Sequence, residues 1–218
     1  MAVRVSGLAQ WSNHLRVTAR LYEPLWRHRS VGLMTAGAYS TERELQSMSA
    51  RLALAPGAAV VDLGCSAGLY ARHLAREGAN ATAVDVSSAF LAEGARRAER
   101  EGVAVRFVRA DVEELPFDAA SFDAAVSGGS LNEFRDPARA LREAARVLRS
   151  GAPLWLMYAA RAEGVAGRIL QGPLRLSGLR FPAPAEVDGW AAAAGFRHER
   201  SERRGPLVFA SYRRGDRG

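Results

Sequence analysis

Residues 60–68, Val60-Val61-Asp62-Leu63-Gly64-Cys65-Ser66-Ala67-Gly68, decide the fold of this chain. A short apolar run over 58–63 leads into a turn that contains two glycines. Apolar and aromatic side chains then recur at helical spacing from Ala67 to Glu77, as in a helix that follows a buried strand. The stretch therefore predicts a strand, a tight turn and a helix in succession.

The same alternation continues along the chain. We expect strands over 81–86, 103–109, 122–127 and 153–159, and helices over 89–102 and 137–150. Asp136 and Pro137 are residue types preferred at the N-cap and at the first helical position. Continuous apolar strands that alternate with helices are typical of a parallel sheet covered on both faces. The predicted fold class is therefore α/β and doubly wound.

The carboxyl-terminal part departs from this order. We expect a helix over 184–195 and then two strands, 196–201 and 207–213, separated by Arg203-Arg204-Gly205-Pro206. Such a short connection cannot hold a helical crossover, so this last pair should be antiparallel. The predicted sheet thus has seven mostly parallel strands with an antiparallel C-terminal strand pair.

Two segments are expected to lie outside the sheet. Residues 1–56 carry aromatic side chains and a helix signal, because Thr41 to Glu44 have the spacing of a capping box and should start a helix toward Leu54. We assign 1–56 to an N-terminal helical cap and 57–218 to the α/β domain. Within that domain, residues 161–181 interleave apolar side chains with arginines and are expected to form a cap or lid.

Composition excludes several classes of protein. The 218 residues are 48% hydrophobic and 24% charged, which is close to the globular average. A single cysteine cannot form an internal disulfide, and the four histidines show no metal-ligand spacing, so we expect no metal site. No apolar run is long enough to span a membrane, and no leader segment is recognisable, so we expect a cytoplasmic protein.

The net charge of +7 is unevenly distributed. All 30 basic side chains are arginine; residues 1–56 hold 7 of them against 3 acids, residues 57–160 hold 12 against 14, and residues 161–218 hold 11 against 6. A nucleic-acid binder usually concentrates arginines and aromatics on one contiguous element. A nucleic-acid substrate is therefore disfavoured, and the excess charge belongs to the two flanks.

The turn itself indicates the chemistry of a ligand. Gly64 and Gly68 permit a close backbone approach, and the next helix offers free N–H donors at its start. Asp85 ends the second expected strand, where a carboxylate can accept hydrogen bonds from both ribose hydroxyls. A nicotinamide cofactor would favour G-x-G-x-x-G, but Ser66 stands where the middle glycine would be. This favours a nucleoside without a diphosphate.

Four motifs in order resemble the class I S-adenosylmethionine-dependent methyltransferases, type 11, and within them the ubiquinone and menaquinone biosynthesis branch. They are the 60–68 stretch, Asp85, the loop Ala110-Asp111-Val112-Glu113-Glu114-Leu115-Pro116-Phe117, and the segment Ser121-Phe122-Asp123-Ala124-Ala125-Val126 followed by 142–151. The resemblance covers residues 55–213. It implies a Rossmann-like fold and S-adenosyl-L-methionine as the cofactor.

The resemblance also implies a role for each position. Asp62 and the backbone of the 64–68 turn would hold the methionine portion, Asp85 the ribose, and Val86 the side of the adenine. Asp111 and Val112 would select adenine, and Tyr22 would close over the cofactor. The cofactor-binding residues expected are Tyr22, Asp62, Gly64, Cys65, Ser66, Gly68, Asp85, Val86, Asp111, Val112 and Ser127.

The acceptor side depends on the loop after the fourth strand, Ser127-Gly128-Gly129-Ser130-Leu131-Asn132-Glu133-Phe134. Many relatives carry a histidine near this loop, and this chain has none there. We therefore expect Asn132 to orient the acceptor or Glu133 to take a proton, and of these two we favour Asn132, with His28 as a further catalytic candidate. The acceptor should be a small, lipophilic or anionic molecule.

Two alternatives to a methyltransferase stay open at this point. One is an NAD(P)-dependent oxidoreductase, and the other is a non-catalytic module that binds RNA or a membrane surface through the arginine-rich flanks. Peripheral membrane contact is compatible with the sequence, and the oligomeric state is left open. Cys65 is interpreted as a small side chain in a tight turn, because no basic partner stands beside it in sequence to lower its pKa.

Overall fold

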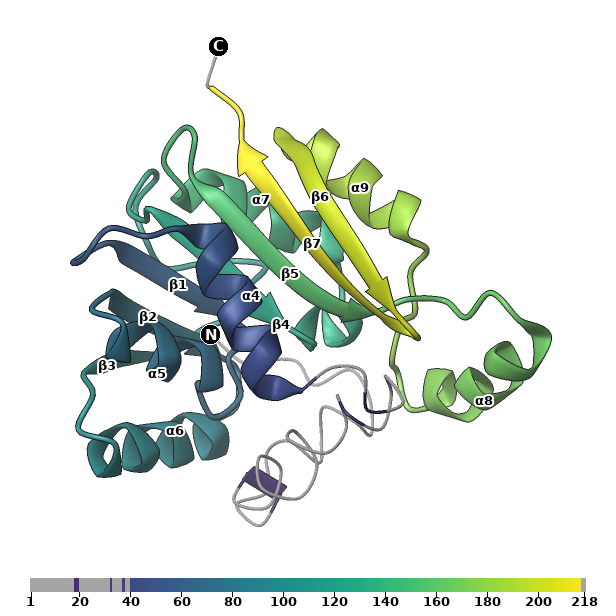
Figure 1. The fold of residues 1–218 in the computed structure, drawn as a ribbon, viewed down its shortest axis with the longest axis horizontal. Helices are drawn as coiled ribbons and strands as arrows, with labels where there is room; N and C mark the ends of the chain where they lie inside the picture. Colours follow the sequence, from purple (N-terminus) through teal and green to yellow (C-terminus); the bar gives the residue numbers. More distant parts are fainter. Residues whose placement is uncertain (1–17, 20–31, 33–36, 38–39, 217–218) are drawn as a thin grey trace.

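A seven-stranded sheet forms the centre of the computed structural model, which describes residues 18–19, 32, 37 and 40–216 (Figure 1). The strand order is β3-β2-β1-β4-β5-β7-β6. Neighbours are parallel except that β7 runs antiparallel to both β5 and β6. The strands are β1 Ala59–Leu63, β2 Asn80–Asp85, β3 Val105–Arg109, β4 Ala124–Gly128, β5 Pro153–Ala159, β6 Phe196–Arg204 and β7 Leu207–Arg214.

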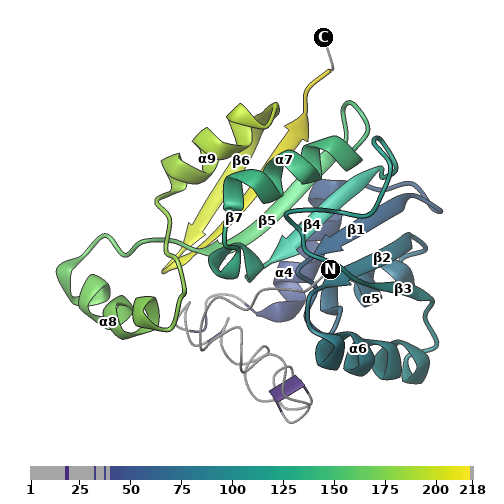
Figure 2. The ribbon, with the colours of Figure 1, turned by 180° about the vertical axis from the view of Figure 1, so that it is seen from behind.

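Helices cover both faces of this sheet. Helices α4 (Thr41–Leu52) and α5 (Leu69–Arg76) lie in front in Figure 1, with α6 (Ser88–Arg100) packed against β2 and β3. Helices α7 (Pro137–Val147) and α9 (Pro184–Ala193) cover the opposite face, seen in Figure 2. Each face has its own apolar cluster, centred on Met48 and Trp155 on the first face and on Leu141 and Val187 on the second. The doubly wound fold class is confirmed.

The expected elements agree with the structure apart from shifts at their ends. The strand over 153–159 is placed as predicted, and Asp136 caps α7 by accepting a hydrogen bond from the Arg139 N–H at 3.0 Å. The capping-box prediction at Thr41 was wrong by one residue. Ser40 is the N-cap of α4, and its hydroxyl accepts from the Arg43 N–H at 3.2 Å.

Part of the segment assigned to the cap belongs to the packed core. In α4, Met48 and Leu52 are buried among side chains of β1, β4 and β5. Ala19, one of the few described residues before 40, packs against Ala67 and Phe90 beside the first turn. The described residues before 56 therefore contact both the sheet and the turn.

Two further elements lie at the carboxyl ends of the parallel strands. The 3₁₀ helix η2 (Ser130–Glu133) follows β4 directly, and α8 (Val165–Leu176) lies between β5 and α9. Figures 1 and 2 both show α8 projecting away from the sheet at this end. Since ligands of open α/β sheets bind beyond the carboxyl ends of the strands, this edge is where a site is expected.

Candidate functional site

The turn after β1 is tightly constrained. Gly64 and Gly68 have φ angles of 69° and 73°, which glycine adopts without strain. A Cβ on Gly64 would lie 2.5 Å from the Cβ of Ser130, so this glycine also permits η2 to approach. The Cys65 N–H donates to the Val84 carbonyl at 2.9 Å, which ties the turn to β2. The backbone is thereby fixed in place beside the start of α5.

Asp62, in β1 just before the turn, contacts the start of α5. Its side chain is buried, and one carboxylate oxygen accepts from the Ala71 N–H in the first turn of α5 at 3.2 Å. A carboxylate near a helix N-terminus is favoured by the partial positive charge there. In the structure Asp62 thus orients the beginning of α5 against β1.

Asp85 at the end of β2 has the strongest electrostatic signature of the site. Its two carboxylate oxygens accept from the Ser66 N–H and the Ser87 N–H, both at 2.8 Å. Burial raises the pKa of this carboxyl to about 6, although these backbone donors act in the opposite direction. An ionised carboxylate offers about four acceptor positions. Asp85 therefore has acceptor capacity left for the two hydroxyls of a ribose.

The loop after β3 is anchored to α7 by two acids. Glu113 is buried and accepts from the Asp136 N–H at 2.8 Å, and Glu143 accepts from the Leu115 N–H at 2.8 Å. Asp111 accepts from the Glu113 N–H at 2.9 Å through one oxygen. The neighbouring Val112 is buried. These hydrogen bonds hold the loop that is expected to bind the adenine beside the ends of β2 and β1.

A buried acid and a tyrosine lie at the start of α5, and we did not predict this pair. The Tyr70 hydroxyl donates to Glu44 of α4, and both side chains are buried. A Cβ on Gly128 would lie 1.7 Å from the Tyr70 ring, so the glycine at the end of β4 makes room for it. The sequence could have indicated a buried acid here, because Glu44 lies on the same face of α4 as the buried residues Met48 and Leu52.

Asn132 makes hydrogen bonds that we did not predict. Its side-chain amide donates to the carbonyls of Ala159 and Arg180 at 2.7 and 2.5 Å, and its oxygen accepts from the Ala159 N–H at 2.9 Å. Its own carbonyl accepts from the Arg180 N–H at 2.8 Å. The amide is therefore committed to backbone groups. In the structure Asn132 links η2 to the end of β5 and to Arg180 at the end of segment 161–181, and its role toward the acceptor stays a prediction.

The remaining predicted residues of this loop are Ser127 and Glu133. The Ser127 hydroxyl is buried and donates to the Leu63 carbonyl at 2.8 Å, so it joins β4 to β1. Ser130 donates to the Gly64 carbonyl. Glu133 ends η2 and is half-buried, as is Val86 after β2. Tyr22 and His28 lie outside the described residues.

The turn, Asp85 and the loop after β3 together fit a nucleoside with an anionic tail. The turn lies at the start of α5, where helix N–H groups suit a carboxylate, and Asp85 suits a diol. S-adenosyl-L-methionine has a ribose, an adenine and an amino-acid carboxylate, so the residues present fit it.

Comparisons with known proteins agree with this geometry. The methyltransferase domain family matches residues 61–156. A ubiquinone biosynthesis O-methyltransferase of Xanthomonas axonopodis pv. citri is 34% identical over 165 residues, which cover 71% of this chain and 69% of that protein. A malonyl-[acyl-carrier protein] O-methyltransferase of Pectobacterium atrosepticum is 32% identical over 80% of this chain and 69% of its own length.

This chain belongs to the S-adenosylmethionine-dependent methyltransferases. It is an enzyme that uses S-adenosyl-L-methionine to methylate a small molecule. Neither the oxidoreductase alternative nor the non-catalytic binding module is favoured.

Solved structures confirm the fold of the methyltransferase. The [4+2]-cyclase SpnF superposes with a TM-score of 0.72 at 22% identity, covering 94% of this chain and 96% of the cyclase. A geranyl diphosphate C-methyltransferase from Streptomyces coelicolor A3(2) superposes with a TM-score of 0.70 at 15% identity, covering 79% and 80% of the two chains. At these identities the likeness concerns the fold alone.

Cys65 has no nucleophilic character in the methyltransferase. Burial, with the charges of Asp85 and Asp62 nearby, raises the pKa of its thiol well above the usual value. The thiol therefore stays protonated at neutral pH and behaves as a small buried side chain. Its part in the site is confined to the backbone of the turn.

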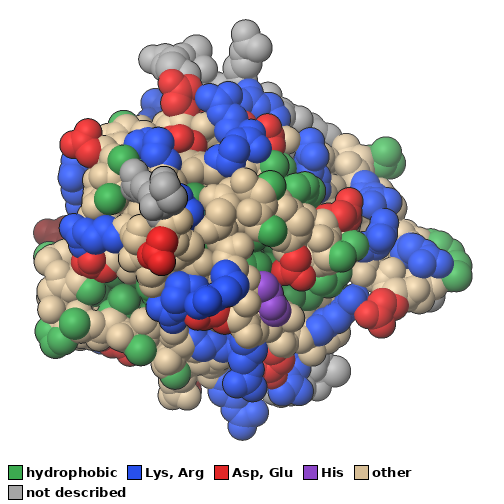
Figure 3. Space-filling model, turned by 90° about the horizontal axis from the view of Figure 1, so that it is seen from above, with side chains coloured by type: hydrophobic (Ala, Val, Ile, Leu, Met, Phe, Trp, Pro, Cys, Tyr) green, Lys and Arg blue, Asp and Glu red, His purple; other side chains and the backbone are tan. Residues whose placement is uncertain are grey.

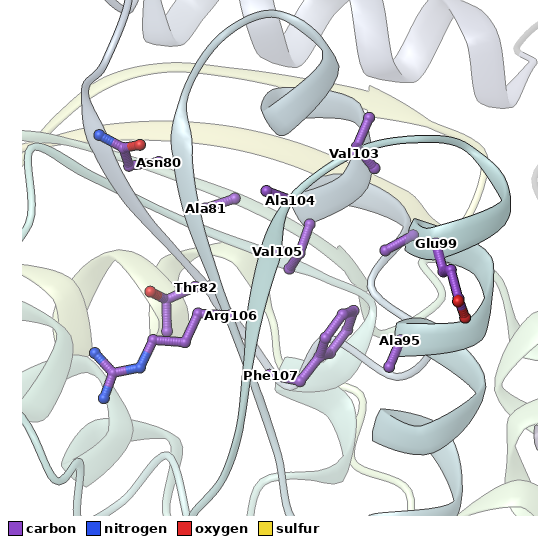
Figure 4. Close-up of a pocket in the computed structure, with 11 residues that line it drawn as sticks. Asn80, Ala81, Thr82, Ala95, Glu99, Val103, Ala104, Val105, Arg106 and Phe107 are labelled. Atoms are coloured by element: carbon purple, nitrogen blue, oxygen red, sulfur yellow. The ribbon is translucent and has the colours of Figure 1, made fainter.

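An open pocket of about 620 Å³ lies where the amino-terminal residues of β2 and β3 meet the end of α6 (Figure 4). Its lining is mostly apolar, and Glu99 and Arg106 are the charged side chains in it. The methyltransferase turn lies at the carboxyl end of β1, so this pocket is not part of the site. Among the described residues, no group of three or more potential ligands could hold a metal ion.

Proposed function

We propose that this methyltransferase acts on a lipophilic small molecule bound between the turn after β1, η2 and the base of segment 161–181. The observation that carries the proposal is the order of these elements along one edge of the sheet. Asp85 follows β2, the turn follows β1, η2 follows β4, and segment 161–181 follows β5. A ribose at Asp85 and an acceptor at η2 are therefore neighbours across the turn.

The protein's own groups bind and position the reactants. When bound, the cofactor would supply a methyl group attached to a sulfonium sulfur, and the neutral thioether S-adenosylhomocysteine would leave as that methyl group is transferred. Asp85 holds the ribose, the backbone of Gly64 to Gly68 holds the amino-acid tail, and Val86, Asp111 and Val112 bind the adenine. Alignment of this kind contributes on the order of 7–11 kcal/mol to well-oriented reactions. No metal is invoked in this scheme.

Glu133 is the proposed proton acceptor of the site. It ends η2, the element that contacts the turn through Ser130 and segment 161–181 through Asn132. A base is needed when the acceptor oxygen or carbon loses a proton as it is methylated. Tyr22 and His28 keep their predicted roles, as a cofactor cover and a further catalytic group.

The names of the relatives support a class of acceptor. Their names include ubiquinone biosynthesis and 2-methyl-6-phytyl-1,4-hydroquinone methyltransferases, and a methyltransferase of malonyl-[acyl-carrier protein]. We therefore place isoprenylated phenols first and acyl-carrier-bound carboxylates second. The single cysteine fits a reducing compartment, so we place the reaction in the cytoplasm.

Methyl transfer to a panel of acceptors tests this proposal. The enzyme is incubated with labelled S-adenosylmethionine and either a prenylated catechol, a prenylated hydroquinone or malonyl-acyl carrier protein, and labelled product is measured. Glu133→Gln should lower kcat by about 10²-fold or more, the usual contribution of a general base, while cofactor affinity stays the same. Product from malonyl-acyl carrier protein alone would contradict the lipophilic class, and an unchanged kcat would remove Glu133 as the base.

A further inference from the structure

Helix α8 concentrates the exposed large apolar side chains of the described residues. They are between 47% and 89% exposed and comprise Val165, Ile169, Leu170, Leu174 and Leu176. Helix α8 makes no substantial contact with another described helix or strand. In Figure 3, green apolar and blue arginine side chains gather at the right-hand end, where α8 lies in Figure 1. Contiguous exposed apolar surface of this kind marks an interaction site.

The helix is oriented by one buried polar side chain. Gln171 donates to the Ala160 carbonyl at 2.9 Å and accepts from the Ala162 N–H at 3.0 Å. At about 100° per residue, the five apolar side chains occupy an arc of about 180° that does not contain Gln171. The side that bonds to the protein and the apolar side are therefore different sides of α8.

Arginines border the apolar arc. Arg168 and Arg175 are seven residues apart, so they lie on the same side of α8, next to the edge formed by Val165 and Leu176. Segment 161–181 holds four arginines and one acid, a net charge of +3. That acid, Glu163, is paired with Arg203 at 2.6 Å. An apolar surface with a basic border is complementary to a surface that is apolar inside and anionic at its boundary.

We propose that α8 is an interfacial helix by which this methyltransferase docks onto an anionic lipid bilayer. Leucine, isoleucine and valine side chains would enter the boundary of the acyl chains, and the arginines would extend their charged ends to lipid phosphates. The 12 residues of α8 are too few to cross a bilayer and sufficient to lie in its surface. A second copy of the chain is a poorer occupant, since a two-fold contact there would bring like-charged arginines together.

The docking face lies at the functional edge of the molecule. Arg180, which ends the α8 excursion, is bonded through its backbone to Asn132 of η2. Docking through α8 would therefore bring η2 and the acceptor end of the site toward the lipid surface. The inference does not depend on the identity of the acceptor, because it rests on α8 alone.

Vesicle binding by the full chain tests the proposal. Co-sedimentation is measured with phosphatidylcholine vesicles and with vesicles that also contain phosphatidylglycerol at about one third of the lipid. We expect binding to the anionic vesicles only. Arg168→Gln with Arg175→Gln should weaken it by about 25-fold, since each basic residue near the surface contributes about fivefold in affinity. Ile169→Glu with Leu170→Glu should abolish it.

Arg197→Gln with Arg200→Gln is the matched control. These two exposed arginines lie on β6, so the variant has the same net charge as the α8 arginine variant. It should bind the anionic vesicles like the wild type, and S-adenosylhomocysteine affinity should be unchanged in all three variants. Equal weakening in the control, no gain from phosphatidylglycerol, or a wild-type dimer that Ile169→Glu with Leu170→Glu dissociates would each overturn the proposal.

Discussion

The carboxylate of Asp85 is subject to two opposing effects. Two backbone N–H groups stabilise its ionised form, while burial stabilises the neutral form and prevails, raising the pKa to about 6. The native state therefore binds more protons than the unfolded chain between pH 3.8 and about 6. Protonated Asp85 therefore contributes to the stability of the native state. The contribution is complete below the pKa of this carboxyl in the unfolded chain and is lost as the pH rises through its pKa in the folded protein. At neutral pH the site thus holds a charge that a ligand can satisfy.

Cofactor affinity should depend on pH through this group. With a pKa of about 6, the ionised fraction of Asp85 falls from about 0.9 at pH 7 to about 0.1 at pH 5. Because we propose that the ionised carboxylate accepts hydrogen bonds from the ribose hydroxyls, the affinity for S-adenosylhomocysteine should fall by about tenfold over this range. Calorimetry at both pH values measures the change. Asp85→Asn should bind weakly with no such slope, and an equally steep slope in this variant would assign the effect to another group.

At the scale of elements, η2 joins parts of the site that come from distant sequence. Ser130 bonds to the turn after β1, and Asn132 bonds to the end of β5 and to the return of segment 161–181. The buried pair of Glu44 and Tyr70 joins α4 to the start of α5 in the same way. These bonds fix how the loops at the carboxyl edge lie relative to one another.

Removal of the Asn132 side chain should loosen segment 161–181. Asn132→Ala deletes three partly buried hydrogen bonds and leaves backbone groups of Ala159 and Arg180 without those partners, a cost on the order of 1 kcal/mol. Trypsin should then cleave faster at the arginines within 161–181, as measured by mass spectrometry.

Ser130→Ala is the paired variant for this test. It loses the bond to the Gly64 carbonyl and keeps the bonds of Asn132. It should weaken cofactor binding without faster cleavage of 161–181. If both variants are cleaved at the wild-type rate, Asn132 does not hold the segment in place.

Short-range sequence patterns predicted the helices and strands better than they predicted the contacts of the candidate site. The strand over 153–159, the antiparallel pair and the Asp136 cap follow from short-range spacing, and all are confirmed. The cap of α4 was misplaced because Ser40 and Thr41 are equally suitable side chains in adjacent positions. The role of Asn132 was not readable, because its partners Ala159 and Arg180 are 27 and 48 residues away. Side-chain to backbone bonds over such separations depend on the assembled sheet.

At the scale of the whole molecule, the distribution of charged side chains differs between the part of the chain proposed to bind the cofactor and segment 161–181. The residues that we propose for the cofactor lie on β1 and β2, in the turn after β1 and in the loop after β3, within the part of the chain that holds 12 arginines and 14 acids. Segment 161–181 leaves from β5 with a net charge of +3. Among the described helices, none is long and apolar enough to cross a bilayer. The basic excess is thus outside the cofactor core, on parts that meet the acceptor or a surface.

Titration of the protein with S-adenosylhomocysteine tests the central claim most directly. The wild type should bind one equivalent per chain. Asp85→Ala should bind on the order of 30-fold more weakly or worse, since two hydrogen bonds to a charged group are lost. Asp118→Ala, which removes an exposed acid on the loop after β3, should bind like the wild type. Absence of binding by the wild type at high micromolar concentration, or equal affinities of the two variants, would contradict the account.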